Sequence, residues 1–256
     1  MLIQISFLVI WLKHLWEAKL LLFLELKAPF AAFRPLQAGT FRSTMPTIPP
    51  TTAYGLLLNL AAIDIRDWSK ISKSSTPTLK KLPKIAQNVQ IAIANLGEPT
   101  ANPEVATLFQ QLHNVPVGKV SAEKWERTKG CKPNIKPIRR EMLIGFHAVV
   151  AVRCSDELQS RITAGLAGEL NEERDYGLPF AGDNNFLFDN ITIVPEVRPL
   201  HWYTRIEAGE LPRIGTCRLT TWIDRENSAN TQIEAFAPIE ISQSEPPEGS
   251  WTKLPM

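Results

Sequence analysis

The sequence predicts an α+β fold, and three of its features carry that prediction. Short apolar strand-like segments alternate with two amphipathic helix-like segments, a basic stretch without regular period follows the second strand, and prolines fall where periodic segments end. Of the 256 residues, 44% are hydrophobic and 21% are charged, which is enough apolar material for a buried core. The 20 prolines against 13 glycines indicate many long connections.

The first part of the chain has the pattern of a strand, a helix and a second strand. Leu21–Lys27 alternates after an apolar start and predicts a strand that ends at Pro29. Thr51–Ile63 follows two prolines and predicts a helix with threonine as its N-cap and an apolar face packed on a sheet. Val89–Asn95 predicts a short strand, and the spacing in Pro103–His113 predicts a short helix.

The second part predicts a strand, a helix, a glycine-bearing loop and a last strand. Glu141–Arg153 is long and apolar enough for a central strand, and Ser155 is placed to cap the amphipathic helix that follows it. The loop YGLPFAGDNN then leads into a fourth strand over Phe186–Val194. This order of elements, with a long insertion before the third strand, is typical of a ferredoxin-like antiparallel sheet.

We expect three regions along the chain. Residues 1–19 form an N-terminal extension, residues 20–200 form the ferredoxin-like domain with an insertion at about 97–140, and residues 201–256 form a β-rich C-terminal extension and tail. The strand-like pieces Arg218–Ile223 and Ile233–Ile241 lie in the last region, where they either extend the sheet or make a small appendage.

The cellular compartment is predicted from the first residues and from the cysteines. The apolar start of the chain is interrupted by charged side chains and lacks both a basic n-region and a small-residue cleavage site, so a secretion signal is not expected. No other apolar stretch is long enough to cross a bilayer. Cys131, Cys154 and Cys217 are far apart and form no C-x-x-C pair, which disfavours a disulfide framework or a zinc site and favours the cytoplasm.

Positive charge is clustered locally, although the net charge of +2 does not by itself indicate a nucleic-acid partner. Arg34 and Arg42 make one cluster, residues 66–84 a second, and residues 116–140 a third with eight basic residues against two acids. Because phosphates bind lysine and arginine while unpaired bases stack on aromatic rings, Phe41 and Trp125 within these clusters fit RNA. The alternative is a solvated surface with buried aromatic side chains.

The glycine-bearing loop suggests a second kind of contact. Gly177 and Gly182 permit close approach of the backbone to a ligand, and Asp183, Asn184 and Asn185 offer short polar groups. An ordinary turn between a helix and a strand is the alternative interpretation. Neither a P-loop lysine nor a G-x-G-x-x-G motif is present, so we expect no nucleotide cofactor.

Catalytic residues are few. The four histidines have no E-x-x-H or C-x-x-H neighbours that would suggest a metal. His147, with Arg139 and Arg140 upstream, is the candidate general acid or base for metal-independent RNA cleavage. The alternative, which we favour, is a packed and hydrogen-bonded strand histidine.

Three segments resemble the DevS-like Cas-five family of type I CRISPR systems. They are LFLELKAPFAAFR, MPTIPPTTAYGLLLNLAAI and YGLPFAGDNNFLFDNI, and a basic insertion separates the second from the third. The resemblance implies a ferredoxin-like (RNA-recognition-motif-like) domain with an inserted thumb hairpin, in a non-catalytic subunit of a Cascade complex. Such a subunit grips the 5′ handle of the guide crRNA for RNA-guided DNA recognition in antiviral defence or guided transposition.

The partners that this resemblance implies are the crRNA, the backbone-repeat subunit and the large subunit, with target DNA contacted indirectly and no membrane. The candidate RNA-binding residues lie in the loop after the first strand, at the start of the first helix, in the thumb and in the glycine loop. In chain order they are Arg34, Gly39, Arg42, Ser43, Thr51, Tyr54, Lys119, Lys124, Trp125, Arg127, Lys129, Lys132, Lys136, Arg139, Arg140, Gly182, Asn184 and Asn185.

Two departures from the family pattern affect these expectations. The first 19 residues have no recognised counterpart. In the subtype whose member processes the guide, a tyrosine, a lysine and a histidine act together, with the lysine directly before the histidine. Here Phe146 precedes His147, which disfavours catalysis.

Overall fold

The computed structural model describes most of the chain. The described residues are 21–36, 39–65, 82–97, 103–119, 122–125, 131–170, 177–224 and 227–254. The predicted N-terminal extension and most of the second basic cluster lie outside these ranges. No helix in the described ranges is long and apolar enough to cross a membrane.

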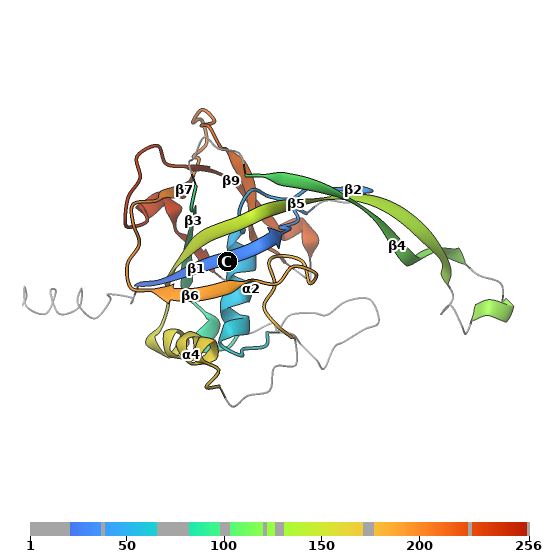
Figure 1. Ribbon diagram of the computed structural model, residues 1–256, viewed down its shortest axis with the longest axis horizontal. Helices are drawn as coiled ribbons and strands as arrows, with labels where there is room; N and C mark the ends of the chain where they lie inside the picture. The colour runs from blue at the N-terminus through green and yellow to red at the C-terminus, as the bar shows by residue number, and fades with distance from the viewer. Residues whose placement is uncertain are drawn as a thin grey trace, which may run out of the picture.

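In the described ranges, the architecture is a large, mostly antiparallel sheet with two α-helices (Figure 1). Four strands make its central part: β1 (Leu21–Ala31), β3 (Val89–Asn95), β5 (Cys131–Arg153) and β6 (Asn190–Val194). Their spatial order is β6-β1-β5-β3, and each neighbouring pair is antiparallel. Strand β1 runs past Pro29, where a sequence-based end was predicted. The missing proline N–H is tolerated because the pairing of β1 with β6 has already stopped at Lys27.

The helices α2 (Pro50–Leu60) and α4 (Asp156–Ala167) follow β1 and β5, respectively, as predicted. Ser155 is the N-cap of α4, and its hydroxyl accepts a hydrogen bond from the Leu158 amide at 3.3 Å. The predicted threonine cap of α2 is wrong. Pro49 occupies that position, and its side chain has no polar atom that could cap the helix. The Thr52 and Ala53 amides donate instead to the Pro49 carbonyl oxygen, both at 3.0 Å.

Alternating side chains of the sheet enter two apolar clusters. Leu22, Leu24 and Leu26 of β1 point into the main core with the apolar residues of α2 and α4. Phe23 points to the opposite face, where Trp202 lies 6.3 Å away between ring centroids. The C-terminal region therefore covers part of the face that the helices leave free.

The C-terminal strands extend the same sheet. Strands β7 (His201–Arg205), β9 (Gln232–Pro238) and β8 (Cys217–Trp222) continue in the order β3-β7-β9-β8, and β10 (Thr252–Leu254) pairs with the other end of β3. Short 3₁₀ turns connect the larger elements: η2 (Lys84–Ala86), η3 (Ala122–Lys124), η4 (Ser228–Asn230) and η5 (Glu248–Ser250).

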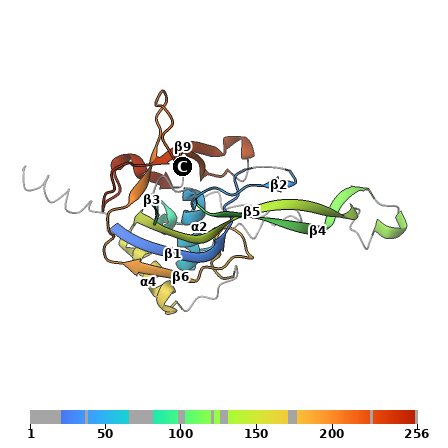
Figure 2. The same cartoon turned by 45° about the horizontal axis from the view of Figure 1, so that its top comes forward.

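A long hairpin projects from the sheet (Figure 2). Strand β4 (Val105–Lys119) pairs antiparallel with the first half of β5, from Val105 opposite Leu143 to Lys119 opposite Cys131. The helix predicted over Pro103–His113 is therefore wrong, because pairing with β5 overrides the local spacing. At the base of this hairpin the two residues of β2 (Phe41–Arg42) add a parallel partner to the other edge of β5.

Gly165 controls how closely α4 approaches α2. A Cβ at this position would lie 1.8 Å from the Leu60 carbonyl oxygen, so Gly165→Ala forces the helices apart. We expect a loss of about 1–3 kcal/mol in the free energy of unfolding, measured by urea denaturation. The matched control is Gly55→Ala in α2, where a Cβ meets nothing within 4 Å and alanine should stabilise the helix slightly. Equal stability of the two variants would contradict the close approach of the helices.

Candidate nucleic-acid interface

Arginine side chains from three separate segments gather at the base of the hairpin around one carboxylate. Arg140 of β5 contacts Asp183 of the glycine loop at 2.8 Å between Nη2 and Oδ2, and their side chains are only 7% and 3% exposed. Arg34, from the segment after β1, reaches the same oxygen at 3.9 Å and is 46% exposed. Asp183 therefore faces two guanidinium groups, one buried and one open to solvent.

Arg42 is the third member of this arginine cluster, which we define as Arg34, Arg42 and Arg140. The pairing of β2 with β5 places Arg42 directly beside Arg140. The pKa of Arg42 is lowered, first by burial and then by repulsion from Arg34 and Arg140, while Asp183 opposes the shift. Three guanidinium groups share one carboxylate, so the cluster has an excess of positive charge that suits a phosphate.

The glycine loop is held against the backbone of the chain itself. Gly182 has φ +80°, and a Cβ there would lie 2.4 Å from the Ala32 carbonyl oxygen. The Ala32 amide donates to the Ala181 carbonyl at 3.0 Å. The absence of a side chain at Gly182 therefore lets the glycine loop lie close to the backbone of the segment after β1. Gly182 thus seats the loop on that segment, and its contact with RNA stays a prediction.

Asp183 is oriented by its own loop. Its Oδ1 accepts hydrogen bonds from the Asn185 amide at 3.1 Å and from the Asn185 side-chain amide at 2.8 Å, which leaves Oδ2 for the arginines. Asn184 and Asn185 are both exposed beside it. Asp183 was predictable as a polar loop residue, but no local pattern indicated that it would neutralise Arg140.

Two predicted site residues lie elsewhere in the fold. The Tyr54 side chain is buried, and its hydroxyl donates to the Ala86 carbonyl at 2.5 Å; burial raises its pKa to about 12. The Thr51 hydroxyl donates to the Thr220 carbonyl at 3.2 Å. The Tyr54 side chain is therefore not accessible to RNA, whereas Thr51 is only partly buried and its contact with RNA stays a prediction.

The remaining predicted residues follow β2 and the hairpin. Gly39, with φ +135°, and the partly buried Ser43 flank β2. Lys136, Arg139 and Trp125 are exposed. In the described backbone, Lys119 lies in β4, Lys124 in η3 and Lys132 in β5. Arg127 and Lys129 lie outside the described residues.

His147 is separate from the arginine cluster. Its Nε2 lies 2.5 Å from Glu25 Oε1, and the Lys27 ammonium lies 3.0 Å from the same oxygen. The pKa of Glu25 is lowered, chiefly by the hydrogen bond from His147 and then by that from Lys27. His147 is thus a hydrogen-bonded strand histidine whose partner is Glu25 rather than Arg139 or Arg140.

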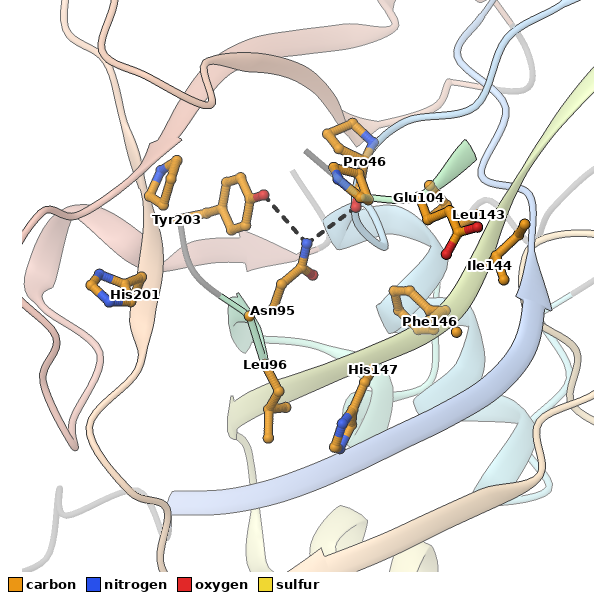
Figure 3. Close-up of a pocket in the computed structure, with 14 residues that line it drawn as sticks. Pro46, Asn95, Leu96, Glu104, Leu143, Ile144, Phe146, His147, His201 and Tyr203 are labelled. Atoms are coloured by element: carbon orange, nitrogen blue, oxygen red, sulfur yellow. Dashed lines mark hydrogen bonds between the residues drawn. The ribbon is translucent and has the colours of Figure 1, made fainter. Parts of the chain in front are cut away.

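A pocket of about 190 Å³ lies between β3, β5 and β7, and His147 and His201 are among its lining residues (Figure 3). Asn95 also lines the pocket, and its side-chain amide donates to the Pro46 carbonyl at 3.1 Å and to the Tyr203 hydroxyl at 3.4 Å. These polar groups satisfy one another. Across the described ranges, no three His, Cys, Asp or Glu side chains gather as a metal site.

Comparison with known proteins gives a likeness of fold. A solved chain titled "CRISPR RNA-guided surveillance complex" superposes with a TM-score of 0.52 at 12% identity, covering 90% of this chain and 96% of that chain. A second, titled "Crystal structure of Cas protein", gives a TM-score of 0.44 at 11% identity, covering 87% and 95%. No family model matches the sequence, and no curated protein matches it.

Proposed function

We propose that this protein is a non-catalytic subunit of a type I CRISPR Cascade complex that grips the 5′ handle of the crRNA. The observation that carries the proposal is the arginine cluster at the base of the hairpin. Its three guanidinium groups share one carboxylate, and Arg34 is well exposed. Such an excess of positive charge beside solvent favours a nucleic-acid phosphate.

The fold supports the same proposal. The element order β1-α2-β3-β5-α4-β6 fits a ferredoxin-like, RNA-recognition-motif-like domain, and the hairpin of β4 and β5 fits an inserted thumb. The structural neighbour with the TM-score of 0.52 bears a title that names an RNA-guided surveillance complex. The partners in this proposal are the crRNA, the backbone-repeat subunit and the large subunit, with target DNA contacted only through the assembly.

The test is a binding and cleavage assay on purified protein with labelled repeat-spacer RNA in the presence of a chelator. A mobility shift that weakens steeply with salt, together with RNA of unchanged length, is the expected result. A protein that assembles with its partner subunits but gives no crosslink to RNA would overturn the proposal in favour of a purely structural subunit.

A metal-independent endoribonuclease that processes CRISPR repeat RNA is the second candidate function. The observation in its favour is that His147 lies beside the pocket with a carboxylate and a lysine next to it. The Nε2 atom of His147 is already hydrogen-bonded to Glu25, which supports a structural role for His147 instead.

Replacing His147 with alanine separates the two candidates. We expect no change in RNA length with either the parent protein or His147→Ala, and a modest decrease in stability from the broken pair, measured by thermal unfolding. His201→Ala, which removes another histidine that lines the pocket, is the control. Discrete cleavage by the parent that disappears only in His147→Ala would establish the nuclease.

A further inference from the structure

Three flat side chains stand in one row across the base of the hairpin. Strand pairing places Arg139 of β5 directly opposite Phe41 of β2 on one side and Phe109 of β4 on the other. Directly paired residues point to the same face of a sheet. The two rings are 45% and 67% exposed, and Arg139 is exposed between them.

The groups in this row are available for a ligand. Within the part of the chain that the structure describes, the Arg139 guanidinium has no ion pair or hydrogen bond, and neither ring contacts another ring. Burial of large aromatic surface is normally favourable, so two exposed rings beside an unpaired cation indicate a surface that something else covers.

The row lies on the face opposite the arginine cluster. Successive residues of a strand point to opposite faces, so Arg42 and Arg140, each one residue further along its strand, point away from Phe41 and Arg139. Arg140 is neutralised by Asp183 on its own face. The base of the hairpin thus carries a phosphate-type site on one face and an aromatic–guanidinium row on the other.

We propose that Phe41, Arg139 and Phe109 form a stacking platform for unpaired bases of single-stranded RNA. This inference rests on the proposed function, since it assigns base contacts to the same RNA-binding subunit. Bases stack on aromatic rings and on guanidinium planes, and a cation between the rings also attracts the polyanion.

The charge on this face favours RNA over a protein partner. The carboxylate on the same face of β5 is Glu141, and it is only partly exposed and accepts a hydrogen bond from the Thr44 amide at 3.1 Å. The exposed charge of the row is therefore positive. An exposed cation without a counter-ion attracts the phosphates of a polyanion such as RNA.

The test compares a fluorescent oligouridylate with an abasic ribose-phosphate oligomer of equal length, using the full chain. The double variant Phe41→Leu/Phe109→Leu keeps apolar volume but removes both rings. We expect it to weaken oligouridylate binding by about tenfold or more while leaving abasic binding and the salt dependence unchanged. Leu211→Ala/Ile241→Ala removes two exposed apolar side chains outside the row and should change neither affinity.

A second variant tests the platform without replacing either ring, so a change in folding caused by the ring substitutions cannot affect its result. Arg139→Lys retains the charge but removes the planar guanidinium at an exposed position, so it should weaken oligouridylate binding more than abasic binding. Thermal unfolding midpoints that match the parent are the check on both variants.

Each contrary outcome has a distinct meaning. The platform is overturned if the platform variants bind oligouridylate with unchanged affinity while a variant lacking Arg34 and Arg42 binds it more weakly. That result leaves the proposed function standing and indicates that a protein covers this face. Equal weakening of both oligomers overturns stacking as the mechanism. A parent protein that binds neither oligomer nor repeat RNA overturns the proposed function and the platform with it.

Discussion

Replacing Arg34 and Arg42 together with glutamine is expected to weaken binding of handle-containing RNA by about 10²–10⁴-fold, because each of the two charge-assisted hydrogen bonds to a phosphate contributes roughly 1.5–3 kcal/mol. The salt dependence should also become shallower, by about 0.7 in the slope of log Kobs against log salt for each phosphate that the protein no longer neutralises. The pKa of Arg42 is already lowered by burial and by its neighbours, so removing Arg34 relieves repulsion and should not unfold the protein. Fluorescence anisotropy across a salt series measures both quantities.

The matched control removes the same charge elsewhere. Arg198 and Arg218 are exposed, and neither has an ion pair within the described residues. Arg198→Gln/Arg218→Gln should therefore retain nearly all of the affinity at physiological salt. If both double variants bind RNA equally weakly, binding reflects overall charge and the arginine cluster is not the site.

Strand periodicity and helix capping explain which elements were predictable. The apolar pattern of Val89–Asn95 predicted its strand, and both ends of the prediction agree with β3 because this strand has partners on both sides and faces the core. Ser155 was predictable as a cap because a serine followed by acidic residues satisfies the first amides of a helix from within one turn. Both signals are local in the chain.

The hairpin was not predictable by the same reasoning. Strand β4 exposes Val105, Leu108 and Phe109, so it shows no alternation of buried and exposed apolar residues. Its conformation depends on pairing with β5, and a local pattern contains no information on that partner. Phe109 was missed as a candidate RNA-binding residue for this reason: a residue assigned to a helix could not be placed opposite Arg139.

The candidate site was predictable in its residue types but not in its arrangement. The charges of Arg34, Arg42 and Arg140 are visible in the sequence, whereas the counter-charge of Asp183 depends on how the glycine loop docks on the segment after β1. Tyr54 was assigned to RNA from its place near a helix start, and only the packing of α2 shows that its ring faces the core.

Replacing Asp183 with alanine is expected to have the largest effect on stability. The Arg140 guanidinium would remain buried without its carboxylate, and breaking a buried ion pair in this way costs about 3–5 kcal/mol. Its Nε is already buried without a hydrogen-bond partner in the described part of the chain, so little else is available to compensate. The substitution would also remove both hydrogen bonds that Asn185 donates. Urea denaturation measures the change in the free energy of unfolding.

A double variant separates the ion pair from the packing around it. Asp183→Leu/Arg140→Met replaces both buried charges with apolar side chains, and such replacements are often neutral or stabilising, so the double variant should be much more stable than Asp183→Ala. A decrease below about 1 kcal/mol in the free energy of unfolding of Asp183→Ala would show that the ion pair does not hold the loop. Because Arg140 and Asp183 neutralise each other, the double variant keeps the charge of Arg34 and Arg42 and should bind RNA about as tightly as the parent protein. The two roles of the cluster would then be distinguished. Asp183 neutralises the buried Arg140 and so supports folding, while Arg34 and Arg42 supply the accessible charge for RNA.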